Sequence, residues 1–221
     1  MDLQRTEEET VEEIKKWWRE NGTAVFIGLA IGISVIVGVR YWGEYQQSQA
    51  QKASEIYNVV NEAIASKNYD VVFAQGQTLI NDYSRTPYAP LAALIMAKAK
   101  FEKNNLTGAQ LHLGWVIDHA SDKGVQHIAR IRLARLLLDN KDYVGAMKVI
   151  DGQGDSAFKS VYDELRGDIA AAQGNMAQAR DAWLLALAAT DIDPNRKQII
   201  QIKLDDAAIS KTASTPATAT K

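Results

Sequence analysis

The sequence contains no cysteine and no excess of positive charge, and each absence narrows the possible function. Without cysteine, the chain can form neither a disulfide nor a thiol-based site, which is compatible with either side of a membrane. The chain has 25 Lys and Arg against 27 Asp and Glu, so it lacks the basic surface that nucleic acid or anionic lipid requires. We therefore predict no nucleic-acid partner.

Side-chain patterns for catalysis or metal binding are also missing. His112 and His119 could share one helix face, but no third ligand at a suitable spacing accompanies them. The motif Gly152-Gln153-Gly154 resembles part of a dinucleotide fingerprint, yet it follows an amphipathic helix pattern instead of a strand, so we predict a turn. Adjacent acidic pairs point in different directions on a helix, and no nucleophile elbow occurs. The sequence predicts no enzyme, metal site, cofactor or small-molecule substrate.

One long apolar run organises the chain. Residues 21–39 carry no charge, and no second run of this kind follows. About 20 residues of helix cross the hydrocarbon layer of a membrane, and aromatic residues flank this run where the two lipid interfaces would lie. The alternative, a buried helix of a soluble core, seldom has paired aromatics at both ends. We predict a transmembrane helix over 21–42, flanked by Trp17, Trp18, Tyr41 and Trp42.

The basic residues near this run predict its orientation, because cytoplasmic flanks carry more Lys and Arg. Arg5, Lys15, Lys16 and Arg19 precede the run, whereas Arg40 and Lys52 follow it. Residues 1–20 are therefore predicted to be cytoplasmic, and the C-terminal domain to lie on the opposite side of the membrane. A cleaved signal peptide ending near Ser48-Gln49-Ala50 is the competing interpretation, but an acidic leader is a poor match to the start of such a peptide.

The segments around the span also predict helix. Two capping-box patterns begin at Thr6 and Thr10, which predicts a short amphipathic helix at the membrane interface or an extension of the spanning helix. Residues 43–54 have no proline and one glycine, so we expect a helical linker. Within the span, small residues recur at every fourth position and predict a helix-packing face formed by Ala24, Gly28 and Gly32.

The remainder of the chain is repetitive. Val72, Ala109, Ala146 and Ala179 align at offsets of 37, 37 and 33 residues, and twelve residues before them lie Val60, Ala97, Ala134 and Gly167. A period near 34 residues is typical of tetratricopeptide repeats, in which each unit is a pair of antiparallel helices. We predict an all-α fold with about four helical hairpins over 55–211.

The end of the repeat region predicts a closing helix. Pro194 suits a first helical turn, and apolar residues then face more than one side, as expected for a helix that caps a solenoid. We expect Lys203, Asp205 and Asp206 to face water, and residues 212–221, rich in Thr, Ala and Ser, to be a disordered tail.

In tetratricopeptide solenoids the first helix of each hairpin lines a concave groove, and the repeat register predicts which residues point into it. Apolar side chains supply affinity there and charges set orientation. The alternative is that Leu94, Phe101 and Ile131 are ordinary interior residues. The predicted groove residues are Leu91, Leu94, Lys98, Phe101, Glu102, Ile128, Ile131, Arg135, Leu138, Glu164 and Asp168.

Several short motifs in a fixed order resemble one known family. They are Glu20-Asn21-Gly22, Arg40-Tyr41-Trp42, Tyr88-Ala89, Leu91-Ala92, Arg132-Leu133-Ala134-Arg135, Leu165-Arg166-Gly167-Asp168, Ala179-Arg180 with Trp183, and Gln201-Ile202-Lys203. Over nearly its whole length the chain resembles the YfgM-like ancillary subunits of the SecYEG translocon, which are single-pass proteins of the bacterial inner membrane. It departs from them in the tail that continues past Ile209.

The resemblance implies a non-enzymatic function in protein secretion. It implies that the protein helps to pass translocating polypeptides from SecYEG to periplasmic chaperones, with the membrane-anchored prolyl-isomerase-like chaperone PpiD as a partner. It also implies an alternative, in which a cytosol-facing regulator restrains the response regulator RcsB. The side of the membrane on which the large domain lies separates the two hypotheses.

Overall fold

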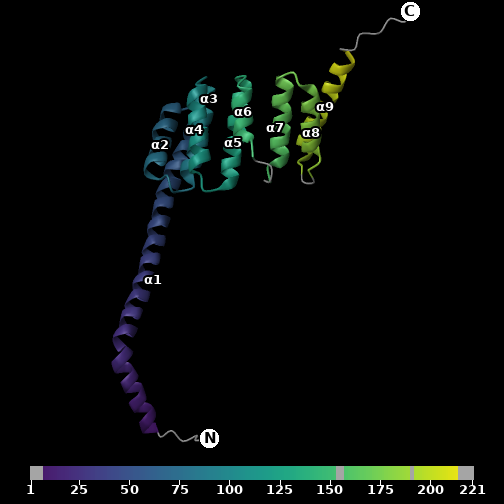
Figure 1. Cartoon of the computed structure of the whole chain (residues 1–221). Helices are drawn as coiled ribbons and strands as arrows, with labels where there is room; N and C mark the ends of the chain where they lie inside the picture. Colours follow the sequence, from purple (N-terminus) through teal and green to yellow (C-terminus); the bar gives the residue numbers. More distant parts are fainter. Residues whose placement is uncertain (1–6, 153–156, 190–191, 214–221) are drawn as a thin grey trace, which may run out of the picture. The chain divides into compact units, whose positions relative to one another are not determined.

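The computed structural model describes residues 7–152, 157–189 and 192–213, which form α-helices and no strand (Figure 1). The all-α prediction is confirmed. The helices are α1 (Glu7–Ala65), α2 (Tyr69–Asp82), α3 (Tyr88–Glu102), α4 (Leu106–His119), α5 (Lys123–Asp139), α6 (Tyr143–Ile150), α7 (Lys159–Ala172), α8 (Met176–Leu187) and α9 (Pro194–Ala213).

The chain divides into two compact units, Met1–Lys52 and Ala53–Lys221, and the boundary between them falls within helix α1. Since α1 begins at Glu7, the residues before the apolar run extend its helix and do not form a separate one; residues 1–6 lie outside the described part. The helix also continues without interruption through 43–54. It is long and apolar enough to span a membrane, and no other helix in the described residues meets both conditions. The side chains of its apolar segment are exposed, as expected for a helix whose solvent is lipid.

The second unit is a series of helical hairpins. Residues 53–65 of α1 pack against α2, α3 pairs with α4, α5 with α6, and α7 with α8, while α9 packs on α8. Helix α5 contacts both α3 and α7, so the first helices of successive hairpins are neighbours. This is the arrangement of a tetratricopeptide-like solenoid, as the period predicts.

The four hairpin turns share one local structure. Asn68, Asn105, Asp142 and Asn175 are the N-caps of the second helices, and each side chain accepts a hydrogen bond from the backbone N–H three residues later. The residue before each cap has a positive φ: 56° at Lys67, 57° at Asn104, 62° at Lys141 and 80° at Gly174. The offsets between these turns equal the predicted offsets, so the repeat alignment is confirmed.

The predicted helix-contact positions are buried in all four hairpins. The positions on the first helices are Val60, Ala97, Ala134 and Gly167, and those on the second helices are Val72, Ala109, Ala146 and Ala179. All eight residues are buried. Small side chains at these positions let paired helices approach closely. The first hairpin, with Val60 and Val72 in one buried cluster, shares this packing.

Helix α9 closes the last hairpin. Ile200, Leu204 and Ala207 are buried against the cluster that contains Trp183, whereas Ile199 and Ile202 are about half exposed. The expectation that Lys203 faces water is wrong, because its ammonium group turns inward to two carboxylates of α7. Thr212 and Ala213, expected in the tail, are the last residues of α9, and 214–221 lie outside the described residues.

Candidate binding groove

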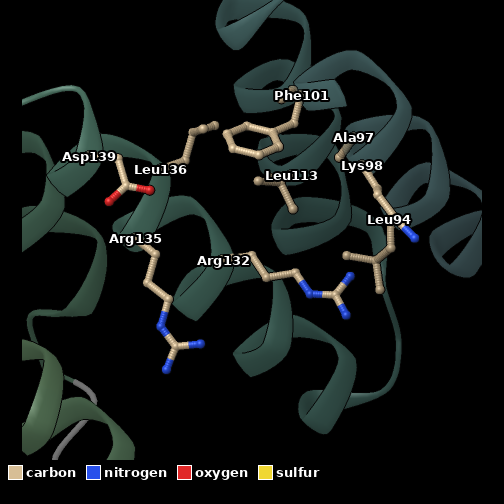
Figure 2. A pocket seen from close by; sticks show the side chains of 10 residues that line it. Leu94, Ala97, Lys98, Phe101, Leu113, Arg132, Arg135, Leu136 and Asp139 are labelled. Atoms are coloured by element: carbon tan, nitrogen blue, oxygen red, sulfur yellow. The ribbon is translucent and has the colours of Figure 1, made fainter. Parts of the chain in front are cut away.

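A groove lies between α3, α4 and α5 and has a volume of about 280 Å³ (Figure 2). We call it the α3–α5 groove. Ala97 of α3 and Ala109 of α4 form part of its wall, and their small side chains leave the space in front of them unfilled. Its lining residues are Leu94, Ala97, Lys98, Phe101, Ala109, Leu113, Arg132, Arg135, Leu136 and Asp139.

The apolar part of the groove is continuous with the core. Leu94, Leu113 and Leu136 are each less than a tenth exposed and belong to the cluster that joins the second hairpin to the third. Phe101 differs, because 49% of its surface is exposed. In Figure 2 the Phe101 ring lies beside Leu113 and Leu136. The groove therefore presents one aromatic ring above a well-packed apolar floor.

The polar part of the groove is mainly cationic. Lys98, Arg132 and Arg135 line it together with a single acid, Asp139. Lys98 has a loose ion pair with Glu102, with 3.8 Å between Nζ and Oε1. Neither Arg132 nor Arg135 has an ion pair within the described ranges. In the view of Figure 2 the Arg132 side chain extends toward Leu94, and that of Arg135 extends away from the apolar side chains.

Four residues predicted for a binding surface line this groove: Leu94, Lys98, Phe101 and Arg135. The remaining predicted residues lie elsewhere. Leu91 and Ile128 pack partly buried against the core cluster of the second and third hairpins, and Ile131 and Leu138 belong to the next cluster. Glu102 is exposed and accepts a hydrogen bond from Tyr69 Oη at 2.9 Å. Most apolar positions of the first helices are thus used in packing hairpin against hairpin.

Glu164 and Asp168 do not line the groove either, because Lys203 of α9 binds both. Lys203 Nζ lies 2.8 Å from Glu164 Oε1 and 2.7 Å from Asp168 Oδ1. Trp183 Nε1 donates to Asp168 Oδ1 at 2.9 Å, and Glu164 is only 7% exposed. We call Glu164, Asp168, Trp183 and Lys203 the cap cluster. These acids fasten the capping helix to the last hairpin.

Arg132, Leu136 and Asp139 of α5 were not predicted as groove residues. They share a helix face with Arg135, since residues three or four apart are neighbours on a helix surface. The predicted face of α5 also included Ile128, Ile131 and Leu138, and a shift of one residue on a helix rotates the face by about 100°. Two arginines three residues apart, Arg132 and Arg135, formed the sequence pattern that could have indicated which face of α5 lines the groove.

The predicted face of the span is open in the isolated chain. Ala24 is exposed, and a Cβ added at Gly28 or Gly32 would meet no atom within 4 Å. Another helix could therefore approach the backbone closely along this face.

The histidines lie apart from the groove. His127 Nδ1 and Tyr162 Oη are 2.7 Å apart, and His127 stacks on Phe158. Burial, with help from Arg130 and Lys123, lowers the pKa of His127, and burial lowers that of His112. Among the described residues, no three His, Asp or Glu side chains are grouped so that they could hold a metal ion. The interactions seen for His127 are those of a packed side chain.

Helical hairpins with a period near 37, small residues at the helix contacts and a capping helix define a tetratricopeptide-like protein. The chain belongs to the tetratricopeptide repeat-like domain family, whose model matches residues 15–209. This match includes the apolar segment of α1 as well as the hairpins.

Several bacterial proteins are similar to this chain over most of its length. The chain is 27% identical over 209 residues to an ancillary SecYEG translocon subunit of Escherichia coli, with 95% of this chain and 100% of the relative covered. It is 26% identical to the proteins of the same name from Haemophilus influenzae and Neisseria gonorrhoeae, which cover 80% and 90% of this chain and are themselves covered over 86% and 96% of their lengths. The family resemblance seen in the sequence is confirmed. No solved structure matches the chain.

Proposed function

We propose that this protein is a non-enzymatic ancillary subunit of the SecYEG translocon that helps to transfer newly translocated polypeptides to periplasmic chaperones. The observation that carries the proposal is the similarity to ancillary translocon subunits along almost the whole chain, with 95% of it covered in one pair. A tetratricopeptide-like domain with an exposed phenylalanine and two exposed arginines in one groove is suited to binding protein partners. PpiD is the proposed chaperone partner.

The proposed orientation has the N-terminus in the cytoplasm and the hairpins in the periplasm. Its support is the excess of Lys and Arg before the span over those after it. Protease added to the periplasmic face of intact inner membranes should degrade the hairpin domain and leave a fragment of the size of the span with its N-terminal residues. If the hairpin domain is spared until detergent is added, the cytosol-facing regulator of RcsB becomes the better hypothesis.

Crosslinking in intact membranes tests the proposed contacts. A photoreactive phenylalanine analogue at Phe101 should form adducts with translocating chains or PpiD, because this ring is 49% exposed and lines the groove. The matched control is Leu184 on α8, which is 51% exposed and lies outside the groove. Equal adducts from both positions would mean that the groove has no special part in binding.

The same method tests the span. We propose that Ala24, Gly28 and Gly32 contact a helix of SecYEG, so a photoreactive residue at Gly32 should label a translocon subunit. Gly38 is the control, since it is an equally open glycine of the same segment but lies six residues from Gly32, on another face of the helix. Absence of any SecYEG adduct from either position would contradict both this contact and the proposed association.

A further inference from the structure

We propose that the α3–α5 groove binds extended polypeptide segments in which an acidic side chain lies next to large apolar ones. This inference rests on the proposed function, because it names the kind of segment that the groove would select from a client or partner. The observation behind it is the juxtaposition of two arginines, which have no ion pair in the described part of the chain, with an exposed phenylalanine and an apolar floor.

The charge of the groove favours an anionic group. Arg132 and Arg135 are three residues apart on α5, so both lie on the groove side of the helix, and both are exposed. The guanidinium group keeps its charge and presents a planar fork of donors that matches a carboxylate. With Lys98 added and Asp139 subtracted, the lining has an excess of positive charge, although the chain as a whole has a net charge of -2. A carboxylate is the complementary group.

The apolar part of the groove indicates what must accompany the carboxylate. Phe101, exposed over 49% of its surface, adjoins Leu113 and Leu136 in Figure 2, so an apolar side chain placed there would lose contact with water. The groove volume of about 280 Å³ lies at the lower edge of the range of roughly 300–1,000 Å³ that small-molecule sites occupy. It suits one or two side chains of a polypeptide better than a whole metabolite.

A protein segment fits these observations better than an anionic membrane surface. Binding to anionic lipid needs a broad basic face, whereas the basic residues of this chain are balanced by acids, 25 against 27. Arg132 and Arg135, which have no ion pair within the described residues, instead line one groove together with buried leucines. Such local pairing of charge and apolar surface is typical of side-chain recognition.

Peptide binding to the full-length chain in phosphatidylcholine nanodiscs tests the inference. Three fluorescent peptides share the same Leu and Phe positions and carry Glu, Gln or Lys between them, and fluorescence anisotropy gives their affinities. We expect the Glu peptide to bind about tenfold more tightly than the Gln peptide, the effect of roughly one charge-assisted hydrogen bond, and the Lys peptide to bind most weakly. Added salt should reduce the advantage of the Glu peptide, because exposed charges are screened.

Variants assign the effect to the groove. Arg132→Gln with Arg135→Gln should abolish the preference for Glu over Gln while the Gln peptide still binds. Phe101→Ser should weaken both peptides at least several-fold. The control is Lys148→Gln with Lys197→Gln, which removes two exposed cations outside the groove and should keep the preference intact. Far-UV circular dichroism of each variant verifies that the helices remain folded.

Three results would overturn the inference: equal affinity for the Glu and Gln peptides, a preference that survives in the double arginine variant, or binding that disappears when anionic lipid is added as a competitor. The proposed function can fail separately. Crosslinks to translocating chains from Phe101 with no preference for acidic peptides would reject this inference and leave the translocon function standing. A clear preference for the acidic peptide in a protein that never crosslinks to SecYEG would support this inference and reject the translocon function.

Discussion

Replacing Trp183 by Ala should lower the free energy of unfolding of the hairpin domain by about 3–5 kcal/mol, as expected for a large-to-small change in a core. Trp183 is 5% exposed and belongs to the cluster that joins α7, α8 and α9. Its indole lies directly over Gly167, where an added Cβ would overlap the ring. The indole N–H also binds Asp168. The variant therefore loses both packing and a hydrogen bond.

Urea unfolding of the full-length protein in detergent, followed by far-UV circular dichroism, measures this effect. Trp183→Phe keeps an aromatic ring in the space, so its free energy of unfolding should fall by less than that of Trp183→Ala. About 1 kcal/mol of this smaller loss comes from the missing hydrogen bond. Leu184→Ala, at an exposed neighbouring position on α8, should change the stability little. If Trp183→Ala unfolds at the same urea concentration as the parent, the assigned packing of the last hairpin is incorrect.

Replacing Lys203 by Met should destabilise the domain by about 2 kcal/mol, between the values for exposed and fully buried ion pairs. Methionine keeps most of the apolar part of the lysine side chain. The loss of stability is therefore caused mainly by removal of the ammonium group. Among the described residues, Glu164, whose side chain is 9% exposed, would retain Arg196 alone as an ionic partner, at 3.7 Å. A poorly compensated carboxylate would then remain near the core, at the contact between α7 and α9.

The matched control is Lys197→Met, which removes an exposed cation from the same helix. Hydrogen exchange should show that the Lys203 variant loses protection first in α9, since a terminal helix held by few contacts opens before the rest. Adding Glu164→Gln to the variant should recover part of the lost stability, because it removes the unpaired charge. Equal stability of the Lys203 and Lys197 variants would show that the cap cluster does not stabilise the fold.

The two predictions concern groups that share Asp168, so their effects should not simply add. Trp183 Nε1 and Lys203 Nζ both contact Asp168 Oδ1, at 2.9 and 2.7 Å. Groups in one hydrogen-bond network commonly show interaction energies of about 0.5–3 kcal/mol. The double variant measures how far the cap cluster acts as one unit.

The residues that line the α3–α5 groove were predicted only in part from the sequence. Leu94, Lys98, Phe101 and Arg135 were predicted for a binding surface and line the groove, because the repeat period orients the first helix of each hairpin. Arg132 and Asp139 were missed as groove residues, because one residue of error in helix register rotates a face by about 100°. Asp168 was predicted for the groove but binds Lys203 instead, a contact that could not be predicted because Lys203 is 35 residues away in the chain.

The sequence by itself determined the helical class, the apolar segment and the hairpin period. These properties depend on local patterns, namely an uncharged run and small residues at a fixed spacing. Only the tertiary structure decided which polar groups remain available. Glu164 was predicted for the groove and Lys203 for the solvent, yet packing of α9 on the last hairpin pairs them, while Arg132 and Arg135 in the α3–α5 groove have no ion pair within the described residues. The reason is that an ion pair depends on distances between helices far apart in the chain, which residue spacing along a single helix does not encode.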